Sequence, residues 1–180
     1  MNRAIYILVM LVLLVSIGFG QMAYKQGDRV LSAGLGLGTF AGVYGEASMP
    51  PISVGYEVGY NENISFGGLA GIAGSKQEYA WFGGSWGWEY TYIILGGRAA
   101  YHFDVFKDPK IDSYAGLTLG YNIVSSKEIG TVQSGYSSSG SYFLYGGHLG
   151  LRYYFSQQLG AQVELGYGLG VINVGISYKM

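Results

Sequence analysis

The sequence contains no cysteine and few charged residues, and both shortages restrict the class of protein. Charged side chains make up 12% of the 180 residues, against about 25% in an ordinary soluble domain. Too few charges are therefore present to cover a water-facing surface. Without cysteine, the chain has neither a disulfide framework nor a thiolate metal site. The formal net charge of -1 gives no reason to expect nucleic acid as a partner.

Long apolar runs are also missing beyond the N-terminus, where no segment has the roughly 20 apolar residues that a transmembrane helix needs. Hydrophobic residues nevertheless reach 49%, and the chain holds 18 tyrosines and 32 glycines. A membrane-like composition without helical spans indicates a closed β-barrel, because only helices and closed barrels pair every backbone polar group inside lipid. The length suits one domain.

The N-terminus has the pattern of a secretory signal. Arg3 supplies the positive charge, residues 4–15 form the apolar run, and Gly18 and Gly20 are small residues at the −3 and −1 positions of a cut before Gln21. We therefore predict a cleavable signal peptide over residues 1–20 and an outer-membrane barrel domain over 21–180. The alternative is an uncleaved membrane anchor, for which the apolar run is short.

From Arg29 onward the dominant hydrophobic period is two, which indicates strands. In residues 52–60, for example, the apolar side chains alternate with serine, glycine and glutamate. The pattern predicts an all-β fold, an eight-stranded antiparallel up-and-down transmembrane β-barrel. The expected strands cover residues 31–37, 52–60, 64–72, 93–103, 114–123, 143–155, 160–167 and 172–180.

The connections between these strands alternate in length. We expect long loops at 39–49, 75–89 and 125–141, and short turns at 61–63, 104–110, 156–158 and 168–170. Outer-membrane barrels place their short turns in the periplasm and their longer loops outside. The pattern therefore predicts that both chain ends face the periplasm, with the last connection short for an outer loop.

A soluble barrel with its apolar face inward would show the same alternation, so alternation alone does not separate the two classes. The polar face is rich in glycine rather than charge, which suits a narrow, strongly curved lumen better than a water-facing surface. The apolar face carries Tyr or Phe near the strand ends, as the aromatic girdles of a membrane barrel do. We therefore favour the membrane barrel.

The closing third of the chain resembles the outer-membrane-protein β-barrel family, the porin-like group that includes the OmpA transmembrane domain and OmpX. The resemblance lies in the runs LRYYF at 151–155, ELGYG at 164–168 and NVGISYK at 173–179. It implies that the barrel insertion machinery reads the last strand as its signal. The residues that would carry this signal are Ile176, Tyr178 and Met180, with Met180 at the position usually held by Phe.

Charged residues on the inward face are expected to pair, because unpaired charges are costly to bury. Around the turn at 156–158, Arg152 falls opposite Gln162 and diagonal to Glu164, within reach of a long side chain. An alternative is a narrow porin for small or apolar solutes. The residues that we expect to form the lumen charge network are Glu57, Arg98, Arg152 and Glu164.

No enzyme activity, catalytic residue, metal or cofactor is expected. A barrel enzyme acting on outer-leaflet lipid would need His, Ser and an acid together near the outer rim, and neither His102 nor His148 shows such a grouping in the sequence. We expect a structural or surface-interaction role in the cell outer membrane, through the extracellular loops. The lipid-modifying enzyme is the least favoured alternative.

All three tryptophans lie in the expected loop at 75–89. Trp86, Trp88 and Tyr90 alternate, so they would share one side of a strand that extends beyond the membrane. This arrangement indicates aromatic packing over the barrel mouth, with an adhesive or glycan-binding patch as the alternative. The expected contact patch comprises Trp81, Trp86, Trp88 and Tyr90. Outer-membrane lipids, the insertion machinery and a surface ligand are the expected partners of a monomer.

Overall fold

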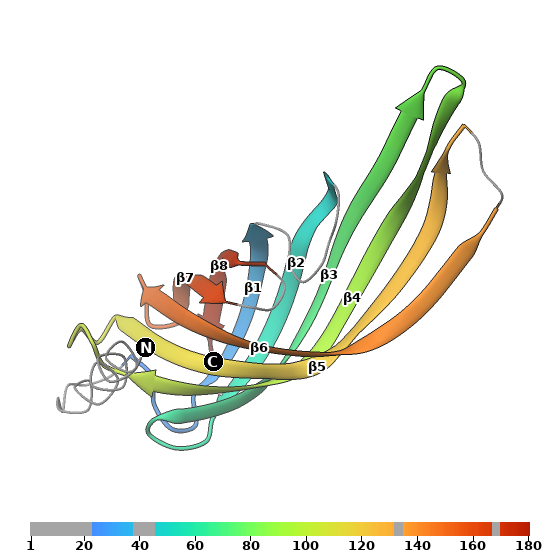
Figure 1. The fold of residues 1–180 in the computed structure, drawn as a ribbon. Coiled ribbons are helices and arrows are strands. Elements are labelled where there is room, and N and C mark those ends of the chain that lie inside the picture. Colours follow the sequence, from blue (N-terminus) through green and yellow to red (C-terminus); the bar gives the residue numbers. More distant parts are fainter. Residues whose placement is uncertain (1–22, 38–45, 132–134, 167–169) are drawn as a thin grey trace, which may run out of the picture.

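The computed structural model describes residues 23–37, 46–131, 135–166 and 170–180. Eight antiparallel strands form a closed ring in which each strand pairs with its chain neighbours and β1 pairs with β8. Figure 1 shows the ring and the long strands that rise out of it. The strands are β1 (Arg29–Leu37), β2 (Glu46–Gly59), β3 (Ile64–Trp81), β4 (Gly84–Phe103), β5 (Ile111–Gly130), β6 (Ser137–Tyr154), β7 (Leu159–Gly166) and β8 (Ile172–Lys179). The predicted eight-stranded up-and-down barrel is confirmed.

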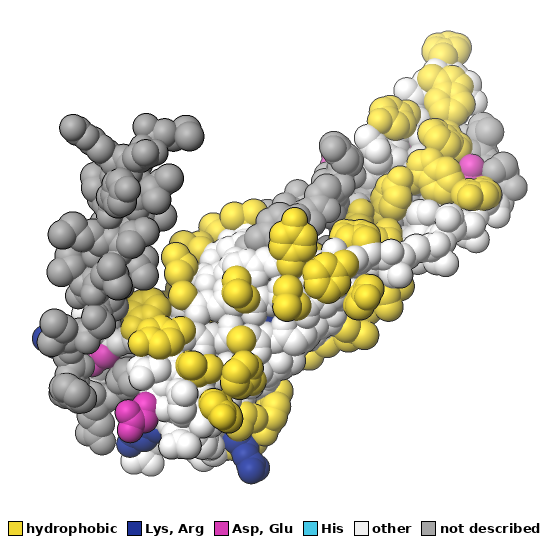
Figure 2. All heavy atoms as spheres, turned by 60° about the horizontal axis from the view of Figure 1, so that its bottom comes forward, with side chains coloured by type: hydrophobic (Ala, Val, Ile, Leu, Met, Phe, Trp, Pro, Cys, Tyr) yellow, Lys and Arg dark blue, Asp and Glu magenta, His cyan; other side chains and the backbone are white. Residues whose placement is uncertain are grey.

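The apolar face of the barrel points outward, as predicted for a membrane barrel. Leu117, Leu119 and Tyr145 are 65%, 56% and 68% exposed, whereas the buried side chains of the interior are mostly polar. Large apolar side chains gather over the outer wall in Figure 2. Such a surface is the reverse of a soluble barrel's and matches the apolar band of a membrane barrel. Within the described residues, no helix is long and apolar enough to cross a membrane.

Two of the predicted long loops are wrong, because most of their residues are strand. β3 continues to Trp81 and β4 begins at Gly84, so the expected loop at 75–89 is a tight hairpin. β5 continues to Gly130 and β6 begins at Ser137, within the expected loop at 125–141. Glycine and serine had obscured the alternation there, but the cross-strand ladder continues regardless.

The region around β2 also differs from the prediction, which began this strand at residue 52. β2 begins at Glu46, and its register with β3 shifts between Ala47 and Met49 and again between Met49 and Ile52. Pro50 and Pro51 lie in the second irregularity, as expected of residues that cannot donate to the ladder. The predicted signal peptide lies outside the described residues, as do residues 38–45, 132–134 and 167–169, where connections were predicted.

The short turns are confirmed at 61–63, 104–110 and 156–158, since each falls between two paired strands. In the last of these, the Phe155 amide donates to the Leu159 carbonyl (3.1 Å). All three turns lie at the end of the ring where the N- and C-terminal segments meet (Figure 1). This end is the periplasmic side of a barrel inserted in the usual direction.

This orientation can be tested by placing single cysteines in the cysteine-free chain. Phe82, at the β3–β4 hairpin, and Val105, in the β4–β5 turn, are both exposed but lie at opposite ends. We expect Phe82→Cys to react with a large polymer-linked maleimide on intact cells. Val105→Cys should react only after the outer membrane is permeabilised. The reverse labelling pattern would contradict the assigned orientation.

Candidate functional site

Arg152 projects from β6 into the lumen, two residues before the strand ends at the periplasmic side, and it is 1% exposed. Its guanidinium donates to both carboxylate oxygens of Glu57 on β2 (2.9 Å each) and to Asp112 on β5 (3.2 Å). The same group lies 4.3 Å from the centre of the Tyr114 ring. Because these partners come from different strands, one cation ties β2, β5 and β6 together across the lumen.

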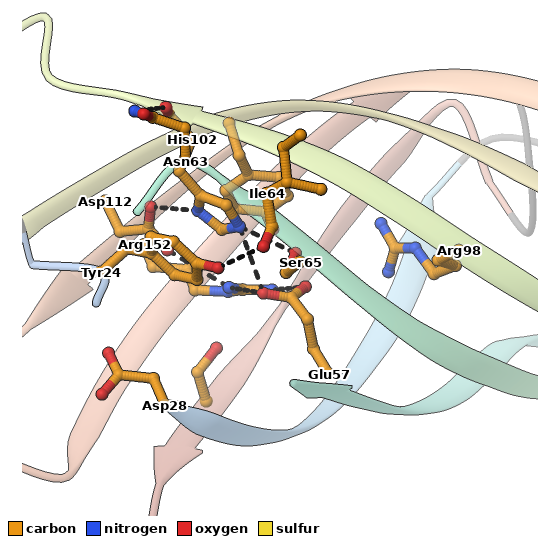
Figure 3. Close-up of polar contacts among 12 residues, drawn as sticks. Tyr24, Asp28, Glu57, Asn63, Ile64, Ser65, Arg98, His102, Asp112 and Arg152 are labelled. Atoms are coloured by element: carbon orange, nitrogen blue, oxygen red, sulfur yellow. Dashed lines mark hydrogen bonds and ion pairs between the residues drawn. The ribbon is translucent and has the colours of Figure 1, made fainter. Parts of the chain in front are cut away.

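A second group extends this layer toward the periplasmic end. His102 Nδ1 lies 2.7 Å from Asp112 Oδ1, and His102 Nε2 lies 2.9 Å from Ser65 Oγ. Figure 3 shows this cluster beside Arg152 and Glu57. His102 is thus grouped with a serine and an acid, but at the periplasmic end and not at the outer rim, for which the sequence predicted no such grouping. Sequence distance conceals the grouping, since three different strands contribute the three side chains.

This arrangement has the connectivity of a Ser–His–Asp triad, but its surroundings do not favour nucleophilic catalysis. Ser65 and His102 are fully buried and Asp112 is 4% exposed. Glu57 lies 3.4 Å from the same His102 nitrogen as Ser65. The group also lies at the periplasmic end, away from the outer rim that a lipid-modifying enzyme requires.

The N-terminal segment covers this cluster. The Tyr24 ring stacks on the His102 imidazole, with centroids 3.7 Å apart and planes 3° from parallel. The Tyr24 hydroxyl donates to the Ile64 carbonyl (2.6 Å). Burial, and then the nearby carboxylates, raise the pKa of Tyr24 to about 12, so the hydroxyl keeps the proton that it donates. Lys179 secures the segment through the Ala23 carbonyl and the Asp28 carboxylate.

A second layer of charge lies farther from the periplasm. Arg98 of β4 donates to Glu164 of β7 (2.7 Å), and the Tyr114 hydroxyl donates to the same carboxylate oxygen (2.7 Å). His148 lies near this layer, with its ring edge-on to Tyr114 at 6.0 Å. Tyr114 thus contacts both layers, because its ring faces Arg152 and its hydroxyl meets Glu164.

The structure places all four residues of the expected charge network in the lumen, but it distributes them over two layers. Arg152 does fall opposite Gln162 in the β6–β7 ladder, yet its guanidinium turns to Glu57 rather than to Glu164. Gln162 instead accepts a hydrogen bond from Ser177 (2.6 Å). The predicted network left out four residues that belong to the two layers. The period of two places each of them on the inward face, so the alternation could have identified them. They are Ser65, His102, Asp112 and Tyr114.

The aromatic residues of the expected contact patch lie where β3 to β6 rise above the ring, on the continuation of the inward face. Trp86 and Trp88 pack edge to face at 5.8 Å, and Tyr136 packs on Trp88 at the same distance. Trp86 Nε1 donates to Glu128 (3.3 Å). Tyr90 and Trp81 occupy the same face by their register. The patch is thus one face of an extended sheet.

The proposed insertion signal lies on the outer wall. Ile176, Tyr178 and Met180 are 57%, 42% and 57% exposed, and Ile176 and Tyr178 belong to β8. Recognition of these residues by the insertion machinery stays a prediction. Among the described residues, no group of three or more histidine or acidic side chains is arranged to hold a metal ion.

Comparison with known proteins shows that the fold is similar to that of solved outer-membrane barrels. No family model and no curated protein matches the sequence. The N-terminal β-barrel domain of OprF from Pseudomonas aeruginosa matches 87% of this chain and 100% of its own length, with 14% identity and a TM-score of 0.55. Neisserial surface protein A matches 85% of this chain and 96% of its own, with 14% identity and a TM-score of 0.56.

The P. aeruginosa outer membrane protein OprG covers 88% of this chain and 99% of its own length, with 10% identity and a TM-score of 0.54. Identities this low establish the fold alone. The chain has the architecture of the small outer-membrane β-barrels. Together with the apolar outer wall, this fold places the protein in an outer membrane.

Breaking the buried charge layer should destabilise the ring strongly, because it leaves a charge buried without its partner. Arg152→Met leaves Glu57 and Asp112 buried without their cation, and breaking such a pair costs about 3–5 kcal/mol. The matched control is Lys127→Met, since Lys127 pairs with Glu89 at 2.9 Å but its side chain is 66% exposed. Exposed pairs contribute at most about 1 kcal/mol. Urea unfolding in detergent, followed by tryptophan fluorescence, measures both, and equal losses would contradict the assignment.

Proposed function

We propose that this protein is a non-enzymatic, non-conducting outer-membrane barrel that uses its projecting sheet to contact partners at the cell surface. The observation that carries the proposal is the unequal length of the strands. β3 to β6 have 18 to 20 residues, whereas β1, β7 and β8 have 8 or 9. An apolar band of about 25 Å needs only about 9–11 residues of a tilted strand.

Each of these four long strands therefore has roughly eight to ten residues more than the membrane requires. These residues form a four-stranded sheet, β3 to β6, that stands above one side of the ring (Figure 1). An ordered sheet with Tyr79, Trp81 and Tyr136 each more than half exposed presents stacking surfaces to an external partner. A barrel with only a structural role has no need of this extension.

The non-conducting part of the proposal is supported by the two charge layers. Side chains just fill the interior of an eight-stranded barrel, and here Arg152, Tyr114 and Glu164 cross it with at most 8% of each exposed. The segment that holds Tyr24 then covers the periplasmic end. A narrow porin would need a water path through both layers and past this segment.

Conductance distinguishes these two functions. The purified full chain, reconstituted in planar bilayers, should give no discrete conductance steps, because the paired charges of both layers leave no water path. A porin inserted in the same bilayers serves as the positive control. Regular, voltage-independent steps from the wild-type protein would refute the non-conducting barrel.

The contact role can be measured on whole cells that display the protein. Trp86→Ser with Trp88→Ser removes the aromatic packing from the inner face of the projecting sheet. We expect the binding of cells to plates coated with polysaccharide or extracellular-matrix protein to fall by about fivefold or more. The amount of protein displayed on the cells is kept equal. Ile129→Ser, on the opposite face by its register with Gly87, should leave binding unchanged. Equal binding by both variants would refute the contact role.

A further inference from the structure

The inner face of the projecting sheet carries a row of aromatic rings. Trp86, Trp88, Tyr90 and Tyr92 occupy alternate positions of β4, so neighbouring rings stand about 7 Å apart along the strand at the usual rise. Trp86 packs edge to face on Trp88 at 5.8 Å, and Tyr90 stacks on Tyr92 at 6.4 Å. The four rings thus form a platform about 20 Å long.

β3 widens this platform on one side. In the β3–β4 ladder Tyr79 lies directly opposite Trp86, and Gln77 lies opposite Trp88, at a separation where cross-strand side chains contact each other. The Gln77 amide donates to the Tyr79 hydroxyl (2.7 Å). Tyr79 and Trp81 are 55% and 52% exposed. Among the described residues, no strand stands in front of these rings, because β1, β7 and β8 stop within the ring (Figure 1).

The charged side chains of the projecting sheet point to its outer face, with one exception. The outer four are Lys76, Glu78, Glu89 and Lys127. The exception is Glu128, whose carboxylate accepts hydrogen bonds from Trp86 Nε1 and from the Tyr136 amide (3.3 Å each). Within the part of this sheet that the structure describes, the inner face has no lysine or arginine. It therefore lacks the cations that a nucleic acid or another polyanion requires.

These features restrict the class of partner. A ligand that lies along the row must present apolar patches at a regular interval, because the rings repeat at every second residue. It must also exchange hydrogen bonds, because tyrosine hydroxyls, Gln77, Ser126 and Ser138 accompany the rings on this face. A neutral glycan has both properties, since its sugar rings repeat and carry C–H groups on their faces and hydroxyls at their edges. Protein interfaces are enriched in arginine and methionine as well as aromatic residues, and the described residues of the inner face include neither.

We propose that this platform binds an extended neutral glycan, whose sugar rings stack on Trp86, Trp88 and Tyr90. The sugar hydroxyls exchange hydrogen bonds with the polar side chains beside the rings, and Tyr79 and Trp81 lengthen the site toward the β3–β4 hairpin. The inference rests on the proposed contact role and names the chemical class of the partner. Salt should change the affinity little, because the complex forms no charge pair that ions could screen.

The test uses the full chain in phosphatidylcholine nanodiscs, which contain no sugar. The chain has 3 tryptophans and all lie on this face, so their fluorescence reports whether the platform is occupied. The probes are cellohexaose, chitohexaose and mannohexaose, which are neutral β-1,4-linked hexamers, and cellohexaose oxidised to carboxylates at C6. We expect at least one neutral hexamer to change the emission saturably and independently of salt. The oxidised hexamer should bind about tenfold more weakly than that neutral hexamer, or less.

Three results would overturn the glycan assignment. They are no response to any neutral hexamer, equal binding of the neutral and oxidised hexamers, and a response only to an extracellular-matrix protein. Each of them leaves the contact role standing, provided that Trp86→Ser with Trp88→Ser still reduces the binding of whole cells. Unchanged binding of those cells would refute the contact role itself.

Two tyrosine variants locate the binding. Tyr90→Ser removes one ring of the row but keeps every tryptophan as a reporter, and it should weaken the binding of the responding hexamer by about fivefold or more. The matched control is Tyr60→Ser, since Tyr60 is 66% exposed in the β2–β3 turn at the periplasmic end, and it should bind like wild type. Equal affinities of the two variants would place the glycan elsewhere. If Tyr90→Ser does not assemble, the comparison of neutral and oxidised hexamers in the wild-type protein decides alone.

Discussion

The structure depends on one constraint, which is that no backbone polar group can be left unpaired inside the apolar layer of a membrane. A ring in which β1 pairs with β8 satisfies it for every strand over the height of the short strands. The membrane also explains why the outer surface is apolar. The wall faces lipid, so every charged side chain at this level must face the lumen. A composition with few charges and many glycines follows, because the lumen of eight strands is narrow.

Little water reaches the lumen, so each charged side chain there needs a partner of opposite charge or a hydrogen bond. Arg152 is the central case, because three residues from β2 and β5 are arranged around its guanidinium. Tyr114 joins this layer to the Arg98–Glu164 pair, and Tyr24 covers it from the periplasmic side. Burying so many ions gains little net stability over an apolar core. Their arrangement instead fixes which strands lie opposite one another.

The sequence allowed the strand number, the inward and outward faces and the short turns to be predicted, because each depends on local alternation or on chain length between alternating segments. The extent of β3 to β6 was underestimated, since glycine and serine at 125–141 hide a period of two that the ladder maintains. The members of the lumen network were predictable, but their partners were not. Arg152 meets Glu57 across the ring, a contact set by the shear and diameter of the whole barrel rather than by the neighbouring hairpin.

The unequal strands give the molecule two regions with different physical requirements. In the lower ring, the paired backbones satisfy the membrane, and paired charges occupy the lumen. Above the ring, β3 to β6 no longer need to close, and water satisfies their outer edges. The boundary between the regions falls on β6, where the ladder to β7 stops at His148 while Tyr145 still belongs to the apolar wall.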